Sequence, residues 1–185
     1  MTSLGKSCLG YMEPLMPALE QRGYEVAVFQ TTGMGGRAFE ALARLPGTRL
    51  VLRSRLYGSK PFGPVAQPEF VNAAAGLLTT LDVEAFFGAL RALEPALGRE
   101  PPRERWGPRA MDLDLLVYGE ERRDGGALTL PHPGIVERNF VLYPLLDIAP
   151  DLMVPGRGRV RELAARVAPE GIWPLPTGPQ PSYPA

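Results

Sequence analysis

The chain of 185 residues carries 20 Lys and Arg against 20 Asp and Glu, so its formal net charge is zero. This length suits one domain with its own core, and the charge balance lacks the basic excess typical of proteins that bind nucleic acid or anionic membranes. The single cysteine, Cys8, cannot form an internal disulfide, and no apolar run reaches the ~20 residues of a membrane span. We therefore expect a cytoplasmic protein, a monomer, with neither nucleic acid nor membrane as a partner.

The first part of the chain alternates between strand and helix patterns. Residues 24–32, YEVAVFQTT, form a branched apolar run that ends at the glycines of GMGG, which predicts a strand and a turn. Residues 37–45 repeat apolar side chains at helical spacing. Residues 48–57 alternate, with Leu50 and Leu52 on one face, which predicts a strand with one solvated side.

The same alternation continues through the middle of the chain. Residues 58–68 are rich in proline and glycine and predict a loop, and residues 69–80 predict a further strand. Asp82 is the expected N-cap of a helix over 83–97, whose apolar side chains form one stripe. A second loop over 98–109 leads into the strand AMDLDLLVY.

This order of elements predicts an α+β fold. Two strand–helix–strand units in a chain of this size favour a ferredoxin-like βαββαβ sheet with helices on one face. Short C-terminal helices from about residue 134 are expected to pack against that unit. The last stretch, PLPTGPQPSYPA over 174–185, lacks the apolar content to pack, so we expect a Pro-rich disordered tail.

The strand after the second loop carries two aspartates. Side chains alternate along a strand, so Asp112 and Asp114 share one face, roughly 6–7 Å apart, and Leu113, Leu115 and Val117 share the other. Two carboxylates at that spacing suit Mg²⁺, which proteins hold by one or two carboxylates plus substrate phosphates. For a lone D-x-D, an edge strand with a solvated acidic face is the commoner meaning.

Basic side chains around the two aspartates favour the metal interpretation. Arginines crowd the preceding loop and recur downstream, at Arg99, Arg103, Arg105, Arg109 and Arg138. Arginine forks match phosphate oxygens. His132 lies between two prolines, six residues before Arg138, which suits a loop that grips phosphate. The two aspartates and the arginines together indicate a site for a metal and a polyphosphate.

Three ordered blocks carry a resemblance to a known family: SRLYGSKPFGPVAQPEFVNAA, RWGPRAMDLDLLVYG and LPHPGIVERNFVLYPLLDIAP. Over about residues 43–155 the chain resembles the 6-hydroxymethyl-7,8-dihydropterin pyrophosphokinases of the folate pathway. The resemblance implies a ferredoxin-like core and two small-molecule substrates, ATP and the hydroxymethyl dihydropterin. The implied reaction moves pyrophosphate from ATP to the pterin and releases AMP.

The resemblance also implies a role for individual residues. The catalytic set is Arg99, Arg109, Asp112 and Asp114, and the two aspartates bind two Mg²⁺ ions. The ATP-binding set is Glu94, Arg99, Arg105, Trp106, Arg109, His132 and Arg138. The set that binds the pterin is Ser59, Phe62, Phe70, Asn72, Trp106 and Phe140. Aromatic rings suit stacking on a flat heterocycle, and an amide suits its edge of donors and acceptors.

The front of the chain departs from that family, because its opening Ala-Leu-Gly-Ser-Asn strand is missing. Residues 3–42 instead resemble a fragment of the ATP-binding domain family related to a tomato mosaic virus resistance protein. We therefore divide the chain into an atypical N-terminal segment (1–42), a pyrophosphokinase core (43–173) and the tail (174–185). Within the first segment, residues 24–42 are expected to substitute for the missing strand and helix.

That substitution makes a specific structural prediction. Residues 24–31 should pair inside the sheet, residues 35–45 should pack on its helical face, and residues 1–20 should lie outside the core. Two alternatives stay open. One is a non-catalytic relic of the fold that binds nucleotide or pterin weakly because its N-terminus is replaced. The other is a nucleotide-binding module built on the glycine loop GMGGRA.

Overall fold

The computed structural model describes residues 25–33, 35–60, 69–98 and 111–176. The first elements are β1 (Glu25–Gly33), α2 (Gly35–Leu42), β2 (Thr48–Arg53), β3 (Tyr57–Ser59), β4 (Phe70–Thr79), α3 (Val83–Ala96) and β5 (Met111–Tyr118). The 3₁₀ helix η1 (Pro133–Val136), α4 (Asn139–Ile148), β6 (Met153–Val154), β7 (Gly158–Arg159), α5 (Val160–Ala164) and β8 (Ile172–Pro174) follow.

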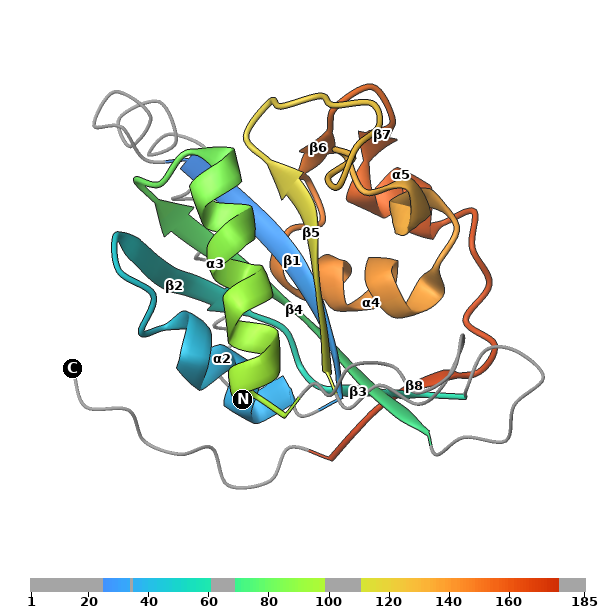
Figure 1. The fold of residues 1–185 in the computed structure, drawn as a ribbon. Coiled ribbons are helices and arrows are strands. Elements are labelled where there is room, and N and C mark those ends of the chain that lie inside the picture. Colours follow the sequence, from blue (N-terminus) through green and yellow to red (C-terminus); the bar gives the residue numbers. More distant parts are fainter. Residues whose placement is uncertain (1–24, 34, 61–68, 99–110, 177–185) are drawn as a thin grey trace.

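The main sheet is antiparallel and runs in the order β5-β1-β4-β3-β8, with β2 also paired to β4 (Figure 1). This order confirms the ferredoxin-like α+β sheet. The strand from the atypical front, β1, pairs with β4 on one side and β5 on the other. The prediction that this segment would lie inside the sheet is confirmed, and α2 follows it and packs on β2 and β4.

Two apolar clusters cover the two faces of the sheet. On one face, α2 and α3 pack through Phe39, Leu42, Phe86 and Leu90. On the other, α4 and α5 pack with the C-terminal segment, and Figure 1 shows these helices on the side away from α3. Asp82 caps α3 by accepting from the backbone N–H of Ala85 at 2.8 Å, as predicted. In the described parts of the chain, no helix combines the length and apolarity that a membrane span requires.

A β-bulge in β5 interrupts the alternation of side chains between the two sheet faces that the sequence predicted. Leu115 and Val117 pair with the consecutive residues Phe29 and Val28, so Leu116 is an extra residue in its strand. An extra residue shifts the alternation by one. Leu115 therefore packs with the α3 cluster, whereas Leu116 and Val117 both pack with the α4 cluster. The prediction that Val117 shares the face of Leu115 was wrong.

A second irregularity affects the strand predicted over 48–57. The register shifts between Leu50 and Leu52, so Leu50 packs on the α3 side and Leu52 on the α4 side, not on one face as predicted. The strand also ends at Arg53. The pairing to β4 resumes with β3, which takes up the first residues of the predicted loop.

The start of the predicted tail is also part of the sheet. Pro174 ends β8, which pairs with β3, and the backbone N–H of Leu175 donates to the carbonyl of Leu56 at 2.8 Å. Trp173 lies across Gly58, where an added Cβ would meet the indole at 2.5 Å. Main-chain pairing needs no apolar side chain, which is why composition alone misassigned this stretch. Residues 177–185 of the predicted tail lie outside the described residues.

Candidate active site

The register of the sheet places Asn72 and Asp112 in one row. Thr32 of β1 pairs with Asn72 of β4 and with Asp112 of β5. Residues paired across strands point to the same face, and two strand spacings separate Asn72 from Asp112 by about 10 Å. Ala74, two residues beyond Asn72, packs in the α4 cluster, so this row faces α4. Asp114 precedes the bulge and therefore shares the face of Asp112, as predicted.

The segment after β5 brings His132 to the same place. Its backbone N–H donates to the carbonyl of Leu116 at 2.9 Å, which fixes the segment beside β5. Its Nδ1 accepts from the backbone N–H of Gly134 at 3.1 Å. A neutral imidazole that accepts at Nδ1 carries its proton on Nε2. The Nε2–H is therefore the group with which His132 can donate to an anionic ligand.

The charged groups that act on His132 come from two separate segments of the chain. Burial is the main cause that lowers the pKa of His132 below its ordinary value, and the positive charge of Arg138 acts in the same direction. The negative charges of Asp114 and Asp112 oppose both. The three charged groups therefore lie close enough to His132 to act on it, although they come from two separate segments.

Arg138 connects this cluster with an aromatic side chain. Its guanidinium lies against Gly134, where an added Cβ would meet Nε of Arg138 at 2.6 Å. The same guanidinium lies 5.8 Å from the centroid of the Phe140 ring. A residue predicted to contact ATP therefore lies next to one predicted to contact the pterin.

The side chains predicted to bind the pterin come from β3, β4 and α4. Asn72 is 1% exposed, and its Nδ2 donates to Ser59 Oγ at 2.8 Å and to the carbonyl of Tyr57 at 3.5 Å. Ser59 is in turn paired with Phe70. Phe140 lies on α4, which packs on β4. The structure thus groups Ser59, Phe70 and Asn72 on the sheet face that α4 covers.

Glu94 occupies a different position, at the edge of the sheet. It is 3% exposed on α3, accepts from the backbone N–H of Leu113 at 3.0 Å and pairs with Arg91 at 3.1 Å. Leu113 lies between Asp112 and Asp114 on the edge strand β5, and its bond to Glu94 shows that its N–H points away from β1. Glu94 therefore holds the backbone that carries both aspartates.

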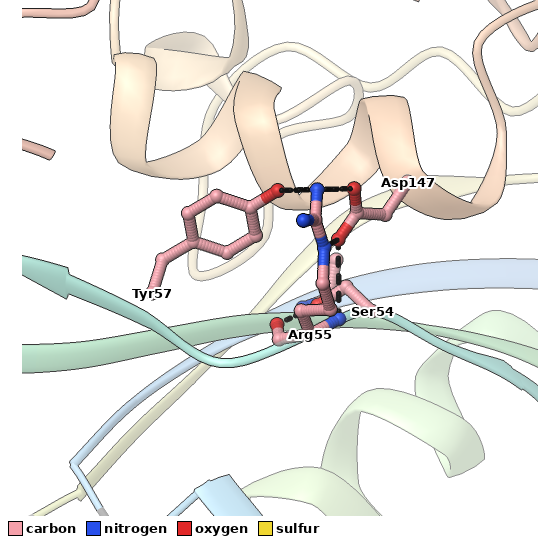
Figure 2. Close-up of polar contacts among 5 residues, drawn as sticks. Ser54, Arg55, Tyr57 and Asp147 are labelled. Carbon is pink, nitrogen blue, oxygen red and sulfur yellow. Dashed lines mark hydrogen bonds and ion pairs between the residues drawn. The ribbon is translucent and has the colours of Figure 1, made fainter. Parts of the chain in front are cut away.

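Sequence reasoning missed a polar network beneath α4, formed by Arg55, Tyr57 and Asp147 (Figure 2). Arg55 donates to both carboxylate oxygens of Asp147, and the Tyr57 hydroxyl donates to Oδ1 at 3.0 Å. Burial and the charge of Asp147 raise the pKa of Tyr57 to about 12. The available signal was an acidic residue inside the apolar run LYPLLDIAP.

Several predicted site residues lie outside the described residues: Phe62, Arg99, Arg105, Trp106 and Arg109. Among the residues that are described, no group of three or more His, Cys, Asp or Glu could hold a metal. Asp112 and Asp114 nevertheless offer hard oxygen donors on one face, beside the neutral His132 and the cationic Arg138. This donor set fits Mg²⁺ held by two carboxylates and completed by substrate phosphates.

Sequence comparisons match most of this chain to one family of known proteins. Residues 31–150 match the model of the family described as 7,8-dihydro-6-hydroxymethylpterin-pyrophosphokinase. The 2-amino-4-hydroxy-6-hydroxymethyldihydropteridine pyrophosphokinase of Pseudomonas aeruginosa is 48% identical over 139 residues, 75% of this chain and 85% of that protein. The protein of the same name from Methylorubrum extorquens is 44% identical over 135 residues, 73% of this chain and 84% of that protein.

Two further matches concern the fold and the front. The structure of Plasmodium falciparum HPPK-DHPS aligns with a TM-score of 0.58 at 11% identity, covering 77% of this chain and 44% of that one. At that identity the likeness shows the shared fold alone. Residues 1–52 match a second family, the C-terminal domain of the uncharacterised protein family UPF0261.

Proposed function

Because the chain belongs to the 7,8-dihydro-6-hydroxymethylpterin-pyrophosphokinase family, we infer that it transfers pyrophosphate from ATP to 6-hydroxymethyl-7,8-dihydropterin in folate biosynthesis. ATP is the co-substrate, and AMP and the pterin diphosphate are the products. The observation that carries this conclusion is the sheet register, which places Asn72 and the carboxylate of Asp112 in one row beneath α4. If Asn72 binds the pterin and Asp112 a metal–phosphate group, as the resemblance implies, their positions lie about 10 Å apart on one face of the sheet.

The reaction requires the hydroxyl oxygen of the pterin to approach the β-phosphorus of ATP in line with the bond that breaks. The hydroxymethyl oxygen of the pterin forms a bond to the β-phosphorus of ATP. The bond from that phosphorus to the oxygen bridging the α and β phosphates breaks, and AMP leaves with the bridging oxygen. The hydroxyl proton passes to solvent. Such a transfer depends mainly on positioning and on charge stabilisation.

On the phosphate side, Asp112 and Asp114 would hold two Mg²⁺ ions. When bound, Mg²⁺ supplies neutralisation of the triphosphate charge. His132 donates from Nε2 and Arg138 from its guanidinium to phosphate oxygens. The resemblance assigns further ATP contacts to Glu94, Arg99, Arg105, Trp106 and Arg109, and catalytic roles to Arg99 and Arg109. What supports this half of the site is that the charges of Asp114, Arg138 and Asp112 all act on the pKa of His132.

On the pterin side, Phe70 and Phe140 stack on the two faces of the heterocycle, and Asn72 bonds its edge. Ser59 orients the Asn72 amide through the bond at 2.8 Å. Phe62 and Trp106 complete the set by resemblance. Support comes from the common sheet face of Ser59, Phe70 and Asn72, and from the position of Phe140 on the helix that covers it.

The enzyme unit comprises residues 43–173 together with 24–42, which substitute for the first strand and helix. The tail expected from 174 is shorter than the sequence predicts, because Pro174 and Leu175 are bonded to the sheet. We propose a separate origin for the front, as a fragment of the ATP-binding domain family related to a tomato mosaic virus resistance protein. Residues 1–52 match UPF0261, a family other than the one that residues 31–150 match, which supports an origin of the front separate from that of the core. We also propose a cytoplasmic monomer whose partners are small molecules. The balanced charge supports the absence of nucleic acid and anionic membrane among them, because it gives no basic excess.

The test is AMP release from MgATP with and without the hydroxymethyl dihydropterin, followed by chromatography of the nucleotides. We expect AMP and pterin diphosphate in equal amounts, and only when both substrates are present. Binding of the pterin without AMP release would instead identify a non-catalytic relic. AMP release that ignores the pterin would contradict the proposed substrate.

A further inference from the structure

The network of Arg55, Tyr57 and Asp147 ties α4 to the sheet through one carboxylate (Figure 2). Asp147 Oδ1 accepts from Arg55 Nη2 at 2.7 Å and from the Tyr57 hydroxyl at 3.0 Å. Its Oδ2 accepts from Arg55 Nε at 3.0 Å and from the Arg55 backbone N–H at 3.2 Å. Four bonds from two residues fix both the position and the orientation of this carboxylate.

On the sheet side, the network begins where the chain passes from β2 to β3. Ser54 bridges this break, because its hydroxyl accepts from the backbone N–H of Ala74 at 2.9 Å and donates to the Arg55 carbonyl at 2.7 Å. Tyr57 then pairs with Asn72, and its carbonyl accepts from the Asn72 amide. Tyr57 is therefore bonded at one end to Asp147 and at the other to a residue of the pterin site.

On the helix side, the network holds the same element that carries Phe140. Asp147 and Phe140 are seven residues apart on α4, which is close to two helical turns, so both lie on one side of the helix about 10 Å apart along its axis. The apolar cluster beneath α4 attracts without direction. The bonds to Asp147 add the directional contact that sets how far α4 stands from β3 and β4.

We propose that Arg55, Tyr57 and Asp147 are positioning residues that hold Phe140 at stacking distance above Phe70 and Asn72, and so set the affinity for the pterin independently of ATP. This inference rests on the proposed function. A flat ring between two surfaces requires a gap of about 7 Å, twice an ordinary carbon contact. A small displacement of α4 would close or widen that gap, whereas Asp112 and Asp114 on β5 would not move with it. Among the described residues of the ATP-binding set, Arg138 alone, the N-cap of α4, would move with the helix.

Stability alone gives little reason for this network. The Asp147 side chain is only 17% exposed, but that of Arg55 is 54% exposed, and an ion pair with one partner so open to solvent stabilises a fold weakly. Tyr57 keeps its proton at every physiological pH, because its ordinary pKa of 10 is already high and burial raises it further, to about 12. The hydroxyl therefore donates to Asp147 under all working conditions.

The experiment compares Tyr57→Phe and Asp147→Asn with the wild-type protein. We expect the KM and the directly measured Kd for the pterin to rise about three- to tenfold for Tyr57→Phe and at least as much for Asp147→Asn. The KM for ATP and the kcat at saturating pterin should stay within about twofold. The double variant should lose less than the product of the single losses, because both changes break the same bond.

Two further variants separate positioning from folding. Arg55→Lys keeps the charge but not the fork, so it should give an intermediate loss of pterin affinity. Asp151→Asn removes a different ion pair, to Arg161 at 2.8 Å beyond the end of α4, and should leave both KM values unchanged. Tyr57→Phe is nearly isosteric, which keeps at least one variant of the network folded.

Each outcome decides the matter. A pterin-selective loss supports the positioning role. Equal losses for pterin and ATP, or a lower melting temperature with an unchanged pterin Kd, overturn it. If the wild-type protein binds the pterin but releases no AMP, the proposed function fails, while the pterin Kd of the variants still decides the inference. A wild-type protein that does not bind the pterin overturns both.

Discussion

Asp112 and Asp114 present two like charges on one face of β5, which is unfavourable without a cation between them. Asp112→Asn or Asp114→Asn should therefore abolish AMP release while leaving the fold intact, and the loss of repulsion should leave the apo protein as stable or slightly more stable. The measurements are AMP release and urea unfolding. Glu120→Gln, an exposed acidic residue just past the strand, is the control and should behave as wild type. Normal activity in either aspartate variant would refute the metal site.

Phe140 belongs to the same site through its ring. Phe140→Ala should weaken pterin binding by about 1–3 kcal/mol through lost stacking and burial, with little change for ATP. Phe87→Ala is a matched control, because Phe87 is also partly buried and also carries an arginine, Arg91, over its ring at 5.4 Å, but it packs with the α3 cluster. Binding titrations of each variant with the pterin and with ATP measure the two affinities. Equal losses for the two ligands would mean that Phe140 is only a core residue.

His132 makes the stability of the apo protein depend on pH. Burial lowers its pKa below the ordinary 6.5, so below that value the unfolded chain binds a proton that the folded chain resists. The His132 contribution is therefore absent above about pH 7 and destabilises increasingly as the pH falls below 6.5. Urea midpoints between about pH 7.5 and 5.5, without Mg²⁺ or ATP, should fall for wild type and stay flatter for His132→Gln. Equal slopes would contradict a buried neutral imidazole.

At the scale of the element, β5 depends on a side chain from α3. The backbone N–H of Leu113 donates to Glu94 at the edge of the sheet. Glu94→Leu would leave this N–H without its acceptor and should cost about 1–3 kcal/mol. Glu94→Gln keeps an acceptor oxygen and should cost less. Urea unfolding measures the loss, and hydrogen exchange of the Leu113 amide should be faster in Glu94→Leu. If Glu94→Leu and Glu94→Gln were equally stable, the bond from the Leu113 N–H to Glu94 would contribute nothing to stability.

The elements also show how far the sequence could predict the site. Alternation placed Asp112 and Asp114 on one face correctly, because the bulge at Leu116 comes after them. The bulge itself could not be predicted from the sequence, because an extra residue in a strand of Leu and Val leaves the apolar pattern of that strand unchanged. The row of Asn72 and Asp112 depends on register with β1, and the Arg55–Asp147 pair joins residues distant in sequence. Neither follows from local patterns.

At the scale of the whole molecule, β1 holds the sheet together. It pairs with β4 and β5, so its removal would expose two strand edges at the centre. Deletion of residues 1–20 should leave a folded protein, whereas deletion of residues 1–32 should leave one that aggregates. Size-exclusion chromatography and circular dichroism distinguish the two. A folded, monomeric product of the longer deletion would show that the front is dispensable.

The central place of β1 also has a consequence for synthesis on the ribosome. The strand that ends at Gly33 is made first, but its partners β4 and β5 end at Thr79 and Tyr118. At the usual rates of elongation, the second partner follows on the order of ten seconds later. Until β4 has been made, the branched, apolar segment of β1 has neither partner strand, and until β5 has been made one of its edges stays unpaired. The nascent chain is therefore a natural client for chaperones that shield such segments until translation has passed β5.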